Sequence, residues 1–129
     1  MIKVWIPTQK GFEEYKEECK KLYHKFQKII AETASFELIC DNTFFYLFTN
    51  NGRFVGAIYY FIKDDGKLYL NGFANRKMHE VCLECLKMSL TWFKGSIYAE
   101  AQNRASALCL LKCGFKREKG NLFVFFKEL

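Results

Sequence analysis

Proline is nearly absent from this chain of 129 residues, and the one proline, Pro7, leaves no proline-rich linker to divide it. The sequence also lacks low-complexity segments, internal repeats and any apolar run near the ~18 residues that a membrane helix needs. The first seven residues are too short and too interrupted for a secretory signal peptide. We therefore expect one domain over residues 1–129, located in the cytoplasm and without a membrane partner.

Acidic residues are fewer than basic ones, 14 against 20, which gives a net charge of +6. This charge is compatible with an anionic ligand such as a nucleotide phosphate, or with nucleic acid, and equally with an ordinary basic surface. No dense Lys/Arg patch with interleaved aromatic residues is present, so nucleic acid is not the favoured partner. Half of the residues are hydrophobic and 18% are aromatic, which argues against disorder and predicts a substantial core.

The chain has six cysteines, and two pairs have spacings that could suggest zinc, Cys82-x-x-Cys85 and Cys109-x-x-x-Cys113. Each pair lies within an apparent helix among apolar residues, without the turn and glycine of a zinc knuckle. Thiols in such positions usually pack as small apolar side chains. We predict reduced thiols and no metal site.

The first part of the chain predicts a strand, a helix and an antiparallel meander. Residues 2–6 read as a short strand, and apolar residues spaced by three and four from Phe12 to Ile30 form one stripe of an amphipathic helix. Residues 31–43 are the least clear part: the helix could continue to about Ala34, or a bend could begin a second short helix. Strands are predicted over 44–48, 54–62 and 68–73, joined by tight turns at 50–53 and 64–67, each with a glycine.

The remaining residues alternate between helix and strand. A deeply packed helix is predicted over 76–93, followed by a strand over 96–101. Asn103 is a good N-cap for a helix over 104–113 that ends at Gly114, and two strands follow over 115–119 and 122–127. Because helix 76–93 connects strands 68–73 and 96–101 as a crossover, we expect these two strands to be parallel.

The segment around Asn103, Gly114 and Phe115 resembles the Asn-x-x-Ala-x-x-x-Tyr-x-x-x-Gly-Phe segment of the GNAT acetyltransferases. The order of predicted elements is similar to that superfamily over essentially the whole chain. The resemblance implies an α/β (α+β) fold with a central mixed sheet flanked by helices. In that fold the fourth and fifth strands, here 68–73 and 96–101, splay apart.

The resemblance also implies acetyl-CoA as the cofactor, with its pantetheine paired to the fourth strand and its pyrophosphate at the start of the next helix. The corresponding positions here are Asn71, Gly72, Phe73, Ala74, Arg76, Lys77, His79 and Asn103. The phosphate loop departs from the family pattern Gln/Arg-x-x-Gly-x-Gly/Ala. Residues 78–82 place no glycine there, so side chains crowd the phosphate and Glu80 adds a repulsive charge.

The catalytic positions depart from the family as well. The general-acid Tyr that the family often places seven residues after the Asn is Leu110 here, and the strand offers Asn71 instead of a carboxylate base. Glu100 is the nearest candidate base, and Tyr98 or Tyr69 is a candidate acid. Amine acetylation can proceed mainly through positioning and a water-relayed base.

Two hypotheses remain open from the residues. The first is an acyl-CoA-dependent N-acetyltransferase that acts on an unidentified small-molecule or protein amine. The second is a catalytically silent GNAT-fold module for binding or assembly, similar to phage virion and head-assembly proteins, which no longer binds CoA and instead serves a protein partner. Titration with acetyl-CoA separates the two.

Overall fold

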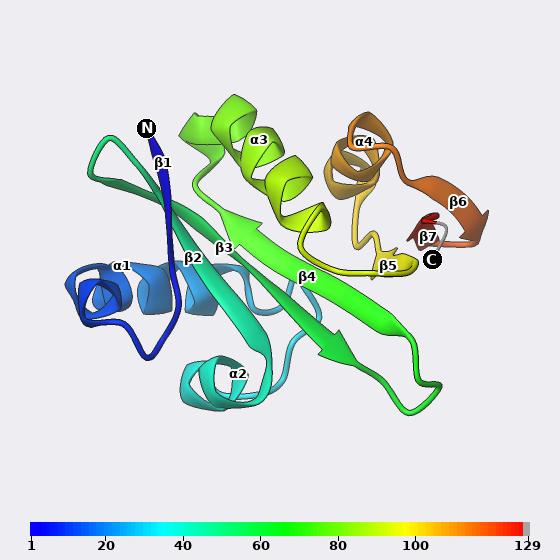
Figure 1. The fold of residues 1–129 in the computed structure, drawn as a ribbon. Helices are drawn as coiled ribbons and strands as arrows, with labels where there is room; N and C mark the ends of the chain where they lie inside the picture. Colours follow the sequence, from blue (N-terminus) through cyan, green and yellow to red (C-terminus); the bar gives the residue numbers. More distant parts are fainter. Residues whose placement is uncertain (128–129) are drawn as a thin grey trace.

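The computed structural model describes residues 1–127, which form a seven-stranded mixed sheet in the order β1-β2-β3-β4-β5-β7-β6 (Figure 1). The strands are β1 (Ile2–Trp5), β2 (Phe44–Asn50), β3 (Arg53–Ile62), β4 (Leu68–Ala74), β5 (Ile97–Glu100), β6 (Lys116–Lys119) and β7 (Leu122–Phe125). The helices are α1 (Lys10–Phe26), α2 (Phe36–Asn42), α3 (His79–Leu90) and α4 (Arg104–Lys112), with the 3-10 turn η1 (Arg76–Met78) before α3. This arrangement confirms the predicted mixed α/β sheet.

The sheet separates two helical layers, with α1 and α2 on one face and α3 and α4 on the other (Figure 1). Side chains of a strand alternate between the two faces. Along β3, Ala57 and Tyr59 therefore pack with α1 and α2, while Ile58 and Tyr60 pack with α3 and α4. No helix of the described residues is long and apolar enough to cross a bilayer.

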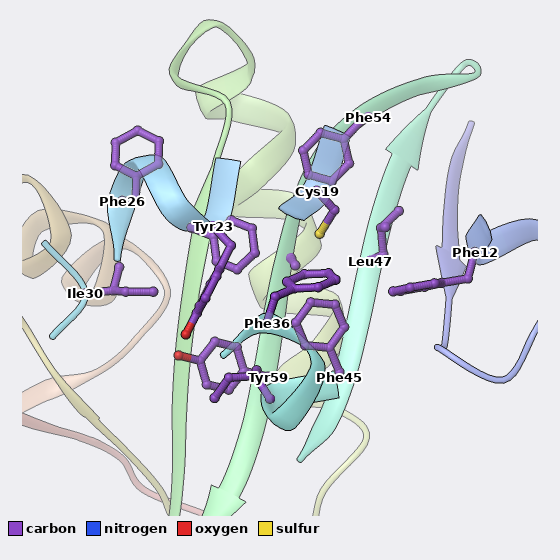
Figure 2. Close-up of a cluster of buried hydrophobic side chains, with 13 residues drawn as sticks. Phe12, Cys19, Tyr23, Phe26, Ile30, Phe36, Phe45, Leu47, Phe54 and Tyr59 are labelled. Atoms are coloured by element: carbon purple, nitrogen blue, oxygen red, sulfur yellow. The ribbon is translucent and has the colours of Figure 1, made fainter. Parts of the chain in front are cut away.

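The core beneath α1 and α2 is dominated by aromatic rings, many of which meet edge to face (Figure 2). Phe45 of β2 lies at its centre, with ring centroids 6.1 Å from Phe12 and 5.8 Å from Phe36. Tyr23 of α1 contacts Phe73 of β4, with ring centroids 5.6 Å apart. Such pairs contribute about 0.5–1.5 kcal/mol each beyond the apolar area that they bury. These contacts hold α1 and α2 firmly against β2 and β4.

Two predicted helices are shorter than the sequence pattern suggests. The first ends at Phe26 although its apolar stripe continues to Ile30, because Ala31 takes a left-handed conformation with φ of 54° and turns the chain. The helix predicted over 76–93 begins with η1 and ends at Leu90, where the amides of Thr91 and Trp92 form tight bonds to Met88 and Ser89. Of the two alternatives for residues 31–43, the second short helix is present as α2, whose N-cap Ser35 accepts from the Leu38 amide at 3.2 Å.

The strands β4 and β5 are parallel, as predicted, and they pair only at Leu68↔Ile97 and Tyr69↔Tyr98. Beyond Tyr69, β4 continues to Ala74 while β5 turns away and pairs with β7 on its other side. The expected divergence of these strands is therefore confirmed. The opening between them is the feature that positions the site.

Candidate functional site

A cleft of about 220 Å³ lies where β4 and β5 diverge. Its walls come from α3 and α4 and its floor from β3 and β4, and most of its surface is apolar. The lining residues are Phe48, Val55, Gly56, Ala57, Ile58, Leu70, Asn71, Gly72, Phe73, Ala74, Cys82, Leu83, Cys85, Leu86, Ala99, Glu100, Ser106, Cys109 and Leu110. Of the predicted binding residues, Asn71, Gly72, Phe73 and Ala74 line this cleft.

The strand β4 presents unpaired main-chain groups to the cleft. Along an antiparallel pair, residues alternately direct their peptide groups toward the partner strand and away from it. The Lys63 amide donates to the Lys67 carbonyl at 3.2 Å and the Asn75 amide to the Val55 carbonyl at 2.8 Å, and these two bonds show which residues of β4 face β3. By that alternation, the peptide groups of Leu70, Gly72 and Ala74 point away from β3. Because β5 has already diverged there, the edge is open to an extended ligand.

Gly72 lets β4 approach β3 closely, and its amide already forms a hydrogen bond within the chain. A Cβ atom at Gly72 would lie 2.9 Å from the Ala57 carbonyl oxygen, so only glycine lets the two strands approach at this point. The Gly72 amide donates to Oδ1 of Asn71 at 2.9 Å. A ligand that uses the Gly72 amide must therefore displace the Asn71 side chain, whereas Leu70 and Ala74 have no such bond to a neighbouring side chain among the described residues.

Asn71 also anchors the segment that connects α1 to α2. Its Nδ2 donates to the Ile30 carbonyl at 3.0 Å, and the Tyr59 hydroxyl donates to Oε1 of Glu32 at 2.8 Å. Tyr23 donates to the Ala34 carbonyl, and its hydroxyl lies at the same edge of the core as that of Tyr59 (Figure 2). Burial raises the pKa of Tyr59 far above its usual value, and the Glu32 charge raises that pKa further. Tyr59 is therefore a hydrogen-bond donor at neutral pH.

Glu32 is a carboxylate that the sequence analysis missed. It lies in the connecting segment that Asn71 holds beside β4, on the face of the sheet that carries α1 and α2. Its partner Tyr59 is 27 positions away along the chain, and no local pattern marks residues 31–43. The contact between Glu32 and Tyr59 can therefore be recognised only in the folded protein.

The candidate base Glu100 reaches the cleft, and the two candidate acids are differently placed. Tyr98 and Glu100 lie on one face of β5, opposite buried Ala99. Glu100 lines the cleft and pairs with Lys63 at 2.8 Å, whereas the Tyr98 ring packs at a tilt against Tyr69, with centroids 5.6 Å apart, and is not part of the lining.

The hydroxyl of Tyr69 is committed to another group. It donates to Oδ2 of Asp65 at 2.7 Å, and this bond raises the pKa of Tyr69 to about 12. The position of the family Tyr, Leu110, contributes an apolar wall of the cleft. Glu100 is thus the acidic residue among the described residues that line the cleft.

The start of the helical segment after β4 is capped by its own chain. The Lys77 amide donates to Oδ1 of Asn75 at 3.1 Å, and the Met78 amide donates to the Asn75 carbonyl at 3.0 Å. The Arg76 guanidinium lies over the Phe26 ring, 5.4 Å from its centroid, toward the end of α1. The predicted phosphate-binding residues Arg76, Lys77 and His79 lie outside the cleft lining.

Asn103 serves as the N-cap of α4, as predicted. Its Oδ1 accepts from the Ser106 amide at 2.8 Å, and the Ser106 hydroxyl oxygen accepts from the Asn103 amide at 3.2 Å. Ser106 lines the cleft, whereas Asn103 does not. The capping box therefore fixes the position of a polar cleft residue.

Three cysteines contribute to the apolar walls of the cleft. Burial raises the pKa of Cys82 to about 11 and that of Cys85 to about 12, and burial also raises the pKa of Cys109. All six cysteines are free thiols, and the described residues contain no cluster of three or more metal-binding side chains. These thiols are neutral at physiological pH and line the cleft as small apolar groups.

No protein-family model and no curated protein sequence matches the chain. Solved structures match over nearly its whole length. Aminoglycoside acetyltransferase AAC(6')-Ib in complex with coenzyme A has a TM-score of 0.72 at 11% identity, over 98% of this chain and 95% of that one. An N-acetyltransferase from Staphylococcus aureus Mu50 has a TM-score of 0.71 at 14% identity, over 98% and 97%.

A GNAT-family acetyltransferase, also from Staphylococcus aureus Mu50, has a TM-score of 0.62 at 15% identity, over 96% of this chain and 98% of that one. Identities this low establish the shared architecture, and function has to be argued from the site. The chain has the GNAT acetyltransferase fold, as the order of its predicted elements indicates.

Proposed function

We propose that the protein is an acyl-CoA-dependent N-acyltransferase that transfers an acetyl group from acetyl-CoA to an amine. The observation that carries the proposal is the open peptide edge of β4 facing an apolar cleft of about 220 Å³. A pantetheine arm alternates methylene groups with amides. Such a chain can add to an exposed strand edge through main-chain hydrogen bonds while its methylene groups contact the apolar walls.

The fit of the two ends of the ligand differs. The free groups of Leu70 and Ala74 and the apolar walls suit the pantetheine arm. At the phosphate end, Asn75 already accepts from two main-chain amides and Glu80 lies in the first turn of α3. Phosphate binding then depends on side chains, chiefly Lys77 and His79, with Arg76 available once it leaves the Phe26 ring. A charge-assisted bond of this kind contributes about 1.5–3 kcal/mol.

The thioester of acetyl-CoA supplies the activated acyl group, and the residues of the chain supply position and proton transfer. The β4 edge holds the ligand in an extended form, and the walls from α3 and α4 exclude water. Glu100 lies at the cleft and can accept a proton from an attacking amine, directly or through one water. Positioning supplies most of the acceleration in this scheme, because Leu110 cannot protonate the leaving thiolate.

Calorimetric titration with acetyl-CoA tests the proposal, with two substitutions at neighbouring positions of α4 as a matched pair. Cys109→Phe places a ring in the cleft, while Leu108→Phe changes an exposed residue outside the lining. We expect binding by the parent and by Leu108→Phe, and loss of binding by Cys109→Phe. A parent protein that shows no binding at about 1 mM acetyl-CoA, the upper end of usual KM values, would refute the enzyme proposal.

A second candidate function is a noncatalytic binding or assembly module. The observation that favours it is the start of the helical segment after β4, where Asn75 satisfies amides that a phosphate would otherwise use. For such a module, we expect no heat of binding on titration with acetyl-CoA, in the parent or in either the Cys109→Phe or the Leu108→Phe variant. The same experiment therefore separates the two functions.

A further inference from the structure

We propose that Lys63 of the protein's own chain is an acyl acceptor at this cleft, so that the protein acetylates itself in the presence of acetyl-CoA. The inference rests on the proposed function, because it needs acetyl-CoA bound between β4 and β5. It goes further by naming an acceptor amine. The test below separates failure of the acceptor from failure of acetyl-CoA binding.

The Lys63 ammonium lies at the point where β4 and β5 begin to diverge. Its Nζ is 4.2 Å from the centroid of the Tyr69 ring and 2.8 Å from Oε1 of Glu100. Tyr69 pairs with Tyr98 as the last matched residues of the two strands, and Glu100 follows at the end of β5 as a cleft residue. Lys63 therefore places a primary amine beside the carboxylate of Glu100, the acidic residue among the described residues that line the cleft.

The contacts of Lys63 are those expected for an amine bound at an acceptor site. An aromatic face and a carboxylate together recognise an ammonium group. The side chains of Lys63 and Glu100 are each 42% exposed, and an ion pair with that exposure adds little to folding stability. The pair is thus free to separate during a reaction without unfolding the protein.

Attachment to the same chain also raises the local concentration of this amine at the cleft. An intramolecular reaction avoids the loss of translational freedom that a second molecule would incur. Lys67 lies nearby, 4.8 Å from the centroid of the Tyr98 ring, but among the described residues the ion pair of Glu100 is formed by Lys63. Geometry therefore favours Lys63 over the neighbouring lysine.

The reaction balances with acetyl-CoA as the sole co-reactant. The Lys63 nitrogen forms a C–N bond to the thioester carbonyl carbon, and the C–S bond breaks. The ammonium nitrogen loses two protons: one passes to the Glu100 carboxylate and then to solvent, and the other passes to the CoA sulfur. The products are acetyl-Lys63, free CoA and one proton. Neutral acetyl-Lys63 no longer pairs with Glu100, which leaves this carboxylate available to an external amine.

Lys20 provides a matched control within the same molecule. It forms a similar ion pair, 2.7 Å from Oε1 of Glu37, and its side chain is 35% exposed. It lies on α1 and neither it nor Glu37 lines the cleft. Uncatalysed acetylation in solution should label Lys20 and Lys63 to a similar degree, whereas acetylation at the cleft should label Lys63 faster than Lys20.

The experiment incubates the purified protein with isotopically labelled acetyl-CoA and follows each lysine by peptide mass spectrometry. We expect Lys63 to be acetylated at least about a hundredfold faster than Lys20, the lower end of the usual effect of a positioned base. The rate per molecule should not depend on protein concentration. Glu100→Gln should slow labelling of Lys63, while Glu37→Gln should not, and acetyl phosphate should label both lysines alike.

Calorimetry with acetyl-CoA accompanies the labelling and distinguishes the two ways of failing. If acetyl-CoA binds but Lys63 is labelled no faster than Lys20, the acceptor inference is wrong and the proposed function stands. If acetyl-CoA does not bind, both are wrong. A rate at Lys63 that is unchanged in a folded Glu100→Gln variant would also overturn the inference, because the acceptor would then not depend on the cleft carboxylate.

Discussion

The hydrogen bond between Tyr60 of β3 and Ser89 of α3 offers a sharp test of how the cleft wall is attached to the sheet. The two oxygens are 2.6 Å apart, and both residues are 0% exposed. Ser89 Oγ also donates to the Leu86 carbonyl at 2.9 Å. Since Ser89 has one hydroxyl proton and gives it to Leu86, the Tyr60 hydroxyl must donate to Ser89.

This direction makes the two single substitutions unequal. Tyr60→Phe removes one hydrogen bond but leaves Ser89 bonded to Leu86, so the free energy of unfolding should fall by about 0.5–1.5 kcal/mol. Ser89→Ala leaves a buried hydroxyl donor on Tyr60 without an acceptor, which should cost about 1–3 kcal/mol. The double variant removes both polar groups and should cost less than the sum of the singles by about 1 kcal/mol.

Urea denaturation of the parent and the three variants measures these differences, with unchanged m-values as the sign that the comparison is valid. Stacking of Tyr60 on Phe93, with centroids 4.2 Å apart, is retained in Tyr60→Phe and serves as the internal control. If Ser89→Ala costs no more than Tyr60→Phe, or if the two costs simply add, the assigned direction of the hydrogen bond is wrong.

Three further outcomes follow from the site and the core. Asn103→Ala should cost about 0.5–2 kcal/mol of unfolding free energy through the lost cap of α4, measured beside Ser106→Ala. In calorimetry, Lys77→Ala should weaken acetyl-CoA at least about tenfold, and Arg76→Ala should weaken it less because that guanidinium lies over Phe26. Burial raises the pKa of the Cys19 thiol, so its contribution to stability is complete below the ordinary value of 9.0 and falls as pH rises above it. Denaturation at increasing pH should show that decline, and less steeply in Cys19→Ala.

The sequence predicted the elements that depend on local chemistry. The glycine turns at 50–53 and 64–67 and the crossover between β4 and β5 follow from turn residues and from the handedness of parallel connections, and both are present. Helix ends were less predictable. Phe93 continues the apolar spacing of α3, yet it packs half-buried on Tyr60 from beyond the helix end, so packing against the core alone does not make the residue helical.

The site was predictable where it depends on strand position and unpredictable where it depends on long-range side-chain contacts. Asn71 to Ala74 line the cleft because β4 continues past its partner strand. The pairing of Glu32 with Tyr59 joins residues from different elements, and the stacking of Arg76 on Phe26 joins η1 to the end of α1. Neither contact leaves a periodic or spacing signal in the sequence.

The capped start of the helical segment after β4 leads to a last prediction about how acetyl-CoA is held. Asn75 occupies the amides of Lys77 and Met78, and displacing such a cap costs about 1 kcal/mol. Phosphate recognition should therefore come from the Lys77 and Arg76 side chains, and two such contacts amount to about two orders of magnitude in affinity. Acetyl-pantetheine, which lacks the nucleotide and its phosphates, should bind the parent about a hundredfold more weakly than acetyl-CoA. The variant with both Arg76→Ala and Lys77→Ala should lose most of this preference and discriminate the two ligands by less than about tenfold, because His79 is then the one proposed phosphate contact that it retains. If the double variant still prefers acetyl-CoA a hundredfold, main-chain amides hold the phosphates and Asn75 has been displaced, contrary to this argument.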